Sequence, residues 1–240
     1  MINVKILYED KHVIVCVKPA GMPSQSDRSS SMDLVSWLKN YLASKEGNVQ
    51  KGVPYVSVVH RLDRPVGGVM VYAKTKKAAE SLSRQFMEHQ TQKNYLAVLT
   101  GSLGKSYGTL EDQLLKDGRT NTSKVVASGG KRACLDYRVL EEKNGLSLVN
   151  VTLHTGRHHQ IRVQMAHAGA GIYGDMKYNR TGTEEWNRNF GTGRKTAELC
   201  LFSSCLTFEH PISHKRMEFK VLPEVGFMTI DEWESLSYYE

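Results

Sequence analysis

The sequence predicts an α+β fold built on a largely antiparallel sheet, and three observations support this prediction. Segments with the alternating pattern of strands outnumber segments with helical periodicity. Many successive strand segments are separated by short turns, such as the one at Asn144 and Gly145, whereas parallel strands need long crossover connections. No internal repeat or low-complexity linker divides the chain. These features favour an antiparallel α+β sheet over a doubly wound one.

The first half of the chain alternates strands with helices. VKILYE and HVIVCVK predict strands around a turn at Asp10, and residues 19–31 then form a loop rich in Pro, Gly and Ser. Residues 32–44 have their leucines on one helical face. YVSVVH and GVMVYAK predict two further strands, and the second leads into a helix capped by Thr75. NYLAVLTG predicts another strand.

The second half is predicted to contain a hairpin, a helix and two closing strands. Residues 101–132 are rich in Gly, Ser, Thr and Lys, so we expect a less regular, partly exposed region with short strands. CLDYRVLEE and LSLVNVTLH form the hairpin, and a helix follows from about His158 to His167. The polar residues 175–197 predict a long loop. The last strands flank HPISHK, and TIDEWESLSYYE predicts a short helix.

Composition indicates a globular protein with a polyanionic partner. The 32 Lys and Arg residues outnumber 25 Asp and Glu residues, which gives a net charge of +7. This excess favours nucleic acid binding, because neutralised phosphates release counterions, although solubility alone would also explain it. No apolar run approaches the roughly 20 residues that span a bilayer, and the N-terminus has no signal-like apolar region. We therefore expect a cytoplasmic protein without a membrane partner.

The cysteines give no sign of a metal site or of disulfide bonds. Cys16, Cys134, Cys200 and Cys205 each lie among apolar neighbours in a predicted strand. The sequence contains no C-x-x-C pair and no H-E-x-x-H pattern. We expect four buried free thiols in a reducing compartment and no metal.

The segment HRLDRPVGG places one acid among basic residues. Asp63 lies between His60, Arg61 and Arg64, and Pro65 then breaks the chain. Nearby positive charge favours an ionised carboxylate, and an ionised carboxylate can serve as a nucleophile. The alternative is a surface ion pair, or an aspartate that caps the turn before the next strand.

This segment resembles the HRLD signature of the RluA-type pseudouridine synthases, and other segments match that family in the same order. They are KPAGMPSQSD at 18–27, QKNYLAVLTG at 92–101 and LHTGRHHQIRVQMAHAGAGIYGD at 153–175. LCLFSSCLTFEHPISHKRMEF is similar to the closing hairpin of the family. The resemblance extends from about residue 5 to about residue 222.

The resemblance implies a single catalytic domain over residues 1–240. In this family a bent, mostly antiparallel mixed sheet with flanking helices surrounds a central RNA-binding cleft. Many relatives also carry an N-terminal S4 domain, and we expect none here because the KPAG segment begins at residue 18. The reaction breaks the N1–C1′ bond of uridine and forms a C5–C1′ bond. It needs no redox change, so we expect no cofactor.

The resemblance also implies the catalytic residues Asp63, Tyr95 and Arg162. Asp63 matches the catalytic aspartate, which attacks C1′, adds to the base or assists a glycal intermediate. Tyr95 matches an active-site tyrosine that can stack on a flipped uracil or exchange a proton. Arg162 matches the arginine that pairs with the aspartate. Taken one by one, Tyr95 would be a core residue and Arg162 a solvated helix residue.

Seven further residues are candidate substrate contacts. Arg61 matches a residue that fills the space of a flipped base or binds the flanking phosphate, and Ile161 packs beneath the base or in the core. The other candidates, each weighed against an ordinary structural role, are His60, Lys18, Arg157, His159 and Gln160.

Two departures from the family pattern bear on the substrate rather than on the chemistry. Val66, Gly67 and Gly68 stand where Thr-Ser-Gly is common, so hydroxyls that could bond the turn are missing. Gln164 stands where His is frequent.

The prediction is therefore an RNA pseudouridine synthase that modifies a specific uridine in rRNA or tRNA, acting as a monomer. The alternative is a non-catalytic RNA-binding protein on the same fold, for which Asp63, Tyr95 and Arg162 would have no evident use together. A glycoside or nucleoside hydrolase would need a second carboxylate, for which the matching segments offer Asp27 and Asp175.

Overall fold

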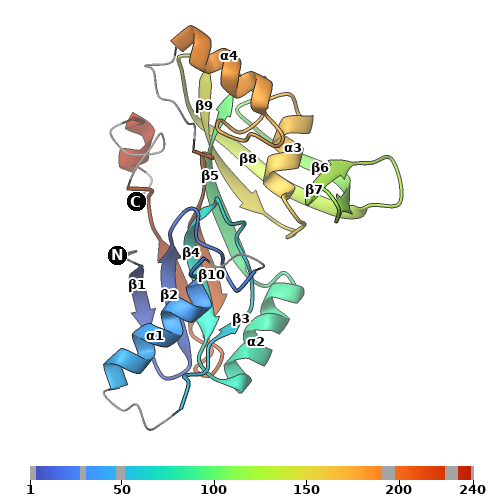
Figure 1. The fold of residues 1–240 in the computed structure, drawn as a ribbon. Coiled ribbons are helices and arrows are strands. Elements are labelled where there is room, and N and C mark those ends of the chain that lie inside the picture. The colour runs from blue at the N-terminus through green and yellow to red at the C-terminus, as the bar shows by residue number, and fades with distance from the viewer. Residues whose placement is uncertain (1–3, 28–30, 47–51, 191–197, 225–231, 239–240) are drawn as a thin grey trace. The chain divides into compact units, whose positions relative to one another are not determined.

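The computed structural model describes residues 4–27, 31–46, 52–190, 198–224 and 232–238 (Figure 1). The chain divides into two compact units. The first contains residues 1–92 and 205–221, and the second contains residues 93–204 and 222–240. Parts of the predicted polar connections and the start of the predicted C-terminal helix lie outside the described residues. The expectation of one catalytic domain over residues 1–240 stays a prediction.

The first unit consists of antiparallel strands and two α-helices. Its elements are β1 (Lys5–Glu9), β2 (Val13–Lys18), α1 (Leu34–Glu46), β3 (Ser57–Val58), β4 (Gly67–Ala73), α2 (Lys76–Met87), β11 (Arg216–Lys220) and the end of β10 (Leu201–Glu209). β2 pairs with β1 and β4, β3 pairs with β4, and β11 pairs with β10, all antiparallel. β10 also neighbours β4. The helix predicted at 32–44 is α1.

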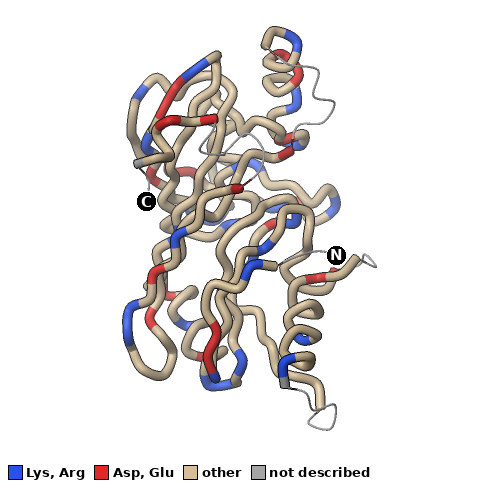
Figure 2. Tube along the Cα trace, turned by 90° about the vertical axis from the view of Figure 1, so that its left-hand side faces the viewer, with Lys and Arg blue, Asp and Glu red and all other residues tan. Residues whose placement is uncertain are grey.

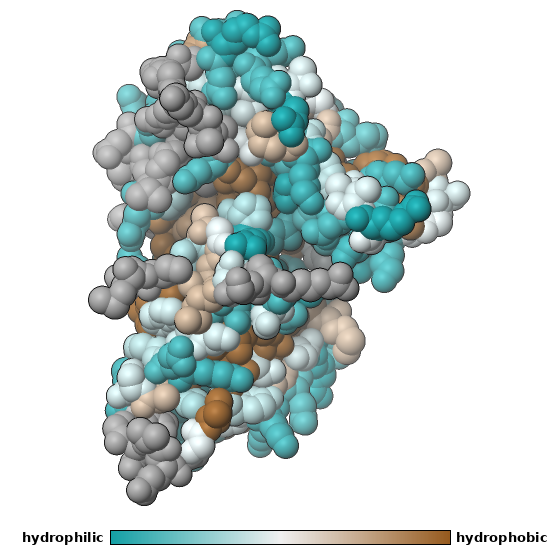
Figure 3. Space-filling view, in the orientation of Figure 1, coloured by the Kyte–Doolittle hydropathy of each residue, from teal (hydrophilic) through white to brown (hydrophobic). Residues whose placement is uncertain are grey.

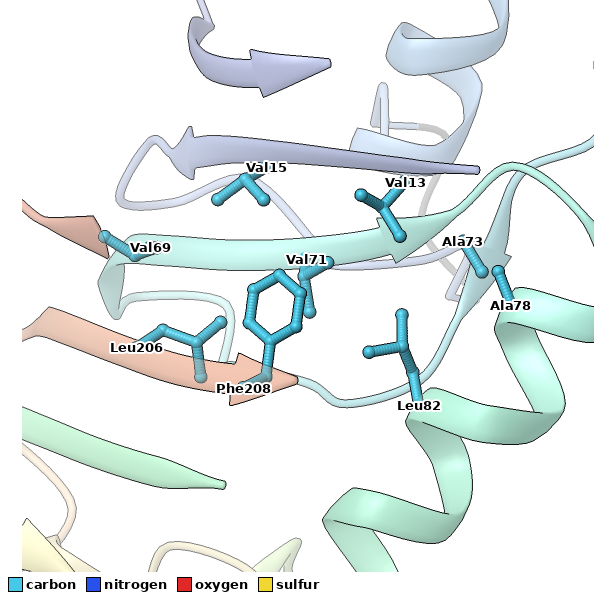
Figure 4. Packing of buried hydrophobic residues seen from close by; sticks show 9 residues of the cluster. All are labelled: Val13, Val15, Val69, Val71, Ala73, Ala78, Leu82, Leu206 and Phe208. Atoms are coloured by element: carbon cyan, nitrogen blue, oxygen red, sulfur yellow. The ribbon is translucent and has the colours of Figure 1, made fainter. Parts of the chain in front are cut away.

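The core of the first unit is apolar and comes from three strands and α2 (Figure 4). Alternate residues of a strand point to the same face, so β2, β4 and β10 each contribute residues two apart in sequence. Thr75 caps α2 as predicted, since its side chain accepts from the backbone N–H of Ala78 at 3.3 Å. The clustered residues are Val13, Val15, Val69, Val71, Ala73, Ala78, Leu82, Leu206 and Phe208.

The second unit is built on five antiparallel strands in the order β5-β9-β8-β6-β7. The strands are β5 (Gln92–Thr100), β6 (Tyr107–Asp117), β7 (Thr122–Val125), β8 (Lys131–Lys143) and β9 (Leu146–Leu153). The helices are α3 (Gln160–His167), α4 (Arg180–Phe190) and the 3-10 helix Glu234–Tyr238. The predicted hairpin turn is confirmed, with left-handed φ of 51° at Asn144 and 72° at Gly145.

Two expectations for the second unit are wrong. Residues 101–132 contain an 11-residue strand, β6, rather than short strands, because exposed and half-buried side chains alternate along it with the period of a strand. Residues 175–197 were expected to be a loop, yet 180–190 form α4. Trp186 anchors that helix: its indole packs edge-on against Tyr173 and its Nε1 donates to the carbonyl of Asn144 at 2.7 Å.

The described surface carries both signs of charge. Figure 2 shows basic and acidic residues on elements of both units, and Figure 3 shows hydrophilic residues over α4. No helix in the described part of the chain is long and apolar enough to cross a membrane. All four cysteines are buried free thiols, as predicted, and burial raises the pKa of Cys16 and of Cys200 to about 12.

Candidate active site

Asp63 lies in the loop between β3 and β4, where its side chain is half-buried. The backbone N–H of Val66 donates to the carbonyl of Asp63 at 2.9 Å, which closes a tight turn. Gly68 has a φ of 126°, a conformation that L side chains rarely adopt. A backbone hydrogen bond and a glycine conformation therefore help to hold this turn.

The loop that carries Asp63 is joined to the KPAG loop by reciprocal hydrogen bonds. The Ser24 hydroxyl donates to the carbonyl of Leu62 at 2.8 Å and accepts from the Leu62 N–H at 3.2 Å. Gly21 donates its N–H to the carbonyl of Arg64 at 2.8 Å, and the Nε of Arg64 donates to the carbonyl of Gly21 at 3.0 Å. Each loop thus fixes the backbone of the other around Asp63.

Lys18 joins the same two loops from inside the unit. Its side chain is fully buried, and its ammonium donates to the carbonyls of Met22 at 2.6 Å, Pro19 at 3.0 Å and Arg64 at 3.1 Å. Burial lowers the pKa of Lys18 to about 7, with Asp63 opposing the shift and Arg64 adding to it. The side chain predicted as an RNA contact is thus occupied by protein carbonyls.

His60 and Arg61 differ in their surroundings although they are neighbours in sequence. The Nε2 of His60 accepts from the backbone N–H of Val71 at 3.1 Å, and its ring stacks on Phe86 at 4.3 Å between centroids. Arg61 is exposed to solvent. His60 therefore holds the start of the loop against β4 and α2, whereas Arg61 is accessible to a ligand.

The second unit carries the other two predicted catalytic residues, both buried. Tyr95 lies in β5, opposite Val151 of β9, and Arg162 lies in α3. Arg162 makes a two-point ion pair with Asp175, in which each N–H···O distance is 2.7 Å. Its guanidinium also lies 5.2 Å from the centroid of the Tyr178 ring. The predicted pairing of Arg162 with Asp63 is not tested, because those residues belong to different units.

Asp175 and Tyr178 are contacts of Arg162 that the sequence analysis did not identify. Besides Arg162, the Asp175 carboxylate accepts from the backbone N–H groups of Lys177 at 3.0 Å and Tyr178 at 3.3 Å. The available signal was the acid at the end of the matching segment GIYGD, together with the preference of arginine for two-point carboxylate pairing. A fully buried carboxylate with these partners orients the arginine.

Tyr95 and α3 belong to the same face of the second unit's sheet. Directly opposite residues of an antiparallel pair project to one face, and the register places Tyr95, Val151, Leu153 and Leu135 on it. Ala133, two residues before Leu135, contacts Val163 of α3 in a small apolar cluster. The sheet and the helix therefore present their predicted functional residues on a common side.

Gln160 is buried, and its side chain is used by the protein. Its Oε1 accepts from the Thr155 hydroxyl at 2.7 Å and from the Arg157 N–H at 3.0 Å. Its Nε2 donates to the carbonyl of Cys134 at 3.1 Å and to Gln164 at 2.9 Å. This predicted substrate contact thus fixes the entry to α3.

Gln164, which departs from the family pattern, continues the network of Gln160. Its Nε2 donates to the carboxylate of Asp112 at 2.7 Å. The departure therefore lies in a buried part of the second unit. Ile161 is buried as well.

His159 ends the segment before α3 in a left-handed conformation, with φ of 54°. Its Nδ1 lies 2.7 Å from the Tyr178 hydroxyl, which also accepts from the backbone N–H of Ser123 at 2.8 Å. Burial, followed by the charges of Arg162 and other cations, lowers the pKa of His159 to about 3. His159 is thus neutral at physiological pH.

The Nε of Arg157 donates to the carbonyl of Arg132 at 2.9 Å.

No group of three or more His, Cys, Asp or Glu side chains is arranged to hold a metal ion within the described residues. Asp63 belongs to the first unit, whereas Tyr95 and the Arg162–Asp175 pair belong to the second.

Comparison with known proteins identifies the family that this chain resembles. Residues 12–167 match the RNA pseudouridylate synthase family. An uncharacterized RNA pseudouridine synthase of Aquifex aeolicus is 33% identical over 245 residues, which cover 97% of this chain and 73% of that protein. A ribosomal large subunit pseudouridine synthase D of Zymomonas mobilis is also 33% identical, over 91% of this chain and 68% of that protein.

The solved structure of human RNA pseudouridylate synthase domain containing 1 has the same fold. It superposes with a TM-score of 0.73 at 23% sequence identity, covering 97% of this chain and 87% of that chain. The predicted α+β pseudouridine synthase fold is thereby confirmed.

Proposed function

This chain belongs to the RNA pseudouridylate synthase family and is an isomerase that acts on RNA, and we propose that Asp63 is its catalytic aspartate. The observation that carries the proposal is the cross-linking of the Asp63 loop. Ser24, Gly21 and Lys18 hold its backbone from one side, so the carboxylate is presented on a rigid support. Preorganised groups of this kind lower a barrier because they need no rearrangement during the reaction.

Tyr95 and Arg162 complete the proposed catalytic set. Tyr95 stacks on the flipped uracil or exchanges a proton with it. Arg162 pairs with Asp63 and keeps the carboxylate ionised and oriented. The pair with Asp175 uses two of the five N–H groups of the guanidinium, which is compatible with a second carboxylate partner.

The other predicted contacts fall into two groups, those that we expect to contact the RNA directly and those whose side chains bond protein groups. We assign to exposed Arg61 the direct role of binding a phosphate or filling the space of the flipped base, which offsets part of the few kcal/mol that flipping costs. Arg157 and Ile161 are further contacts to the nucleotide. His60, Lys18, His159 and Gln160 act by holding the loops that meet the RNA, since their side chains already bond protein groups.

We propose large-subunit rRNA as the first substrate to test, ahead of tRNA, because several similar proteins are named ribosomal large subunit pseudouridine synthases. The choice of uridine is assigned to residues 101–132 and 175–197. We further propose that the two units act as one catalytic domain, in a monomeric cytoplasmic protein, and light scattering would test the monomer.

Release of tritium from C5 of uridine tests the function, because bond formation at C5 expels that hydrogen. RNA from cells lacking the protein, labelled with tritium at C5, would be incubated with wild type or with Asp63→Asn. We expect wild type to release tritium, and we expect the rate of release to fall by about 10²- to 10⁴-fold in the variant. The control is the circular dichroism spectrum and unfolding curve of the variant, which should match those of wild type.

Two other outcomes would contradict the proposal. RNA binding without release by either protein would indicate the non-catalytic RNA-binding alternative. Release of free uracil by wild type would indicate a hydrolase, since isomerisation leaves the mass of the RNA unchanged.

A further inference from the structure

Lys93, the second residue of β5, is a buried cation for which the described residues supply no partner. Its exposed fraction is 9%, and no described group lies within hydrogen-bond or ion-pair distance of its ammonium. Burial lowers the pKa of its ammonium, with no carboxylate opposing the shift. Among the described residues, the fully enclosed side-chain atoms without a hydrogen-bond partner belong to His12, Thr91 and Ser235, so the Lys93 ammonium keeps contact with solvent and is accessible to a ligand.

The sheet around Lys93 offers no counter-charge. Lys93 precedes Tyr95 by two residues, so both side chains project to the same face of β5, about 7 Å apart along the strand. The register places Val151 opposite Tyr95, and its continuation places Leu153 opposite Lys93. Both cross-strand neighbours are buried and apolar. The residues of β9 opposite this part of β5 therefore do not neutralise Lys93.

We infer that Lys93 binds an anionic oxygen of the RNA substrate, beside the base that stacks on Tyr95. The inference rests on the proposed function and assigns a role to a residue outside the proposed catalytic set. Two substrate groups have this chemistry. One is the backbone phosphate next to the target nucleotide, and the other is the uracil once it is detached from the ribose.

The detached uracil fits the position of Lys93 better than the phosphate does. When the N1–C1′ bond breaks, its electron pair stays on the uracil, whose negative charge spreads to O2 and O4. The C5–C1′ bond then forms, C5 loses its proton to solvent and N1 takes one up, so atoms and charge balance. A cation near the ring stabilises the anion only while the base is free, which lowers the barrier without tightening ground-state binding.

The contrast with Arg162 on the same side of the unit supports this assignment. Arg162 is equally buried, but Asp175 neutralises it within the protein. Lys93 has no such carboxylate among the described residues. The fold thus supplies one cation that a protein carboxylate neutralises and one that is left to solvent or to a ligand.

The test compares Lys93→Met, which keeps the side-chain volume, with Lys93→Arg, which keeps the charge. Lys77→Met is the control, because it removes an exposed lysine of α2. Tritium release would be followed with excess enzyme on large-subunit rRNA labelled at C5 of uridine. Filter binding of the same RNA at several salt concentrations would give the dissociation constant, and urea unfolding would give stability.

If Lys93 holds the detached uracil, Lys93→Met slows the saturated rate by about 10²-fold, as loss of one anion-stabilising donor does in other enzymes. Its dissociation constant stays within about threefold of wild type, its stability is equal or higher, and Lys93→Arg retains more activity than Lys93→Met. If Lys93 instead binds a phosphate, affinity falls, the salt dependence of binding loses about one unit of slope, and the saturated rate is unchanged.

Several results would overturn the inference. Wild-type rate and affinity in Lys93→Met would show that no substrate anion depends on Lys93. Unfolding of Lys93→Met alongside a folded Lys93→Arg would show that the charge supports the fold instead. An absence of tritium release from wild type would contradict the proposed function, and the binding measurements would still decide whether Lys93 contacts RNA.

Discussion

Two buried lysines, one in each unit, differ in the hydrogen-bond partners of their ammonium groups. The ammonium of Lys18 donates to three backbone carbonyls, which belong to the two loops around Asp63. Lys93 has no such acceptor among the described residues. Both are buried, so burial alone does not separate a structural charge from a functional one. The distinction lies in whether the protein itself supplies the hydrogen-bond partners that the charge needs.

The largest expected effect is the loss of stability on removal of Asp175, the carboxylate partner of the buried Arg162. Asp175→Ala leaves Arg162 without its carboxylate and leaves the N–H groups of Lys177 and Tyr178 without their acceptor. Breaking a buried pair in this way costs about 3–5 kcal/mol in the free energy of unfolding, measured by urea denaturation.

The control for Asp175→Ala is Asp136→Ala. Asp136 pairs with His154 at the same 2.7 Å, but the two side chains are 48% and 47% exposed. An exposed pair contributes about 1 kcal/mol or less, so this variant should remain close to wild type. Equal losses in the two variants would show that compensation of buried charge does not govern stability here.

A smaller loss is expected for Lys18→Met. The carbonyl of Met22 loses its donor, whereas the carbonyl of Arg64 keeps the N–H of Gly21. Because an unsatisfied buried acceptor costs about 1–3 kcal/mol, we expect a decrease of about 1–3 kcal/mol in the free energy of unfolding. The stability of Lys93→Met is the comparison, because we expect that variant to be as stable as wild type or more stable. If both variants lose the same stability, the two lysines have the same structural role.

The smallest expected effect is the pH dependence of the contribution of Lys18 to the free energy of unfolding. The native pKa of Lys18 is about 7, below the roughly 10.4 of an unfolded lysine, so the unfolded chain binds more protons between these values. The contribution of Lys18 to stability therefore increases as pH rises above 7 and is lost as pH falls through 7.

We therefore expect the difference in unfolding free energy between wild type and Lys18→Met to grow by about 1 kcal/mol from pH 6.5 to pH 8. Subtracting the variant removes the titration of all other groups. A constant difference over this range would show that Lys18 keeps an ordinary lysine pKa in the folded protein.

The sequence predicted the elements whose signals are local. Strand alternation, the leucine spacing of α1, the Thr75 cap and the Asn144-Gly145 turn depend on neighbouring residues, and each is present. The helix α4 was missed because its stability comes from Trp186, which contacts Tyr173 and the carbonyl of Asn144, both distant in sequence. Tertiary contacts of this kind leave no local pattern.

The candidate site shows the same limit. The motifs located the segments that contain Asp63, Tyr95 and Arg162, but they did not separate side chains that hold the protein from side chains that are accessible. Lys18, His60 and Gln160 bond protein groups that are revealed only by the fold. Asp175 and Lys93 likewise stand out only once burial and hydrogen-bond partners are known.

The division of the chain into interrupted units has a consequence for synthesis on the ribosome. The first unit needs Leu206 and Phe208 for its core, and His210 bonds Asp10 at 2.9 Å across 200 positions of sequence. All of residues 93–204 are translated before those partners emerge. At about 5–20 residues per second this takes roughly 6 to 20 s, during which the apolar faces of β2 and β4 lack part of their cover. The nascent chain therefore presents a binding site for chaperones that the finished protein no longer has.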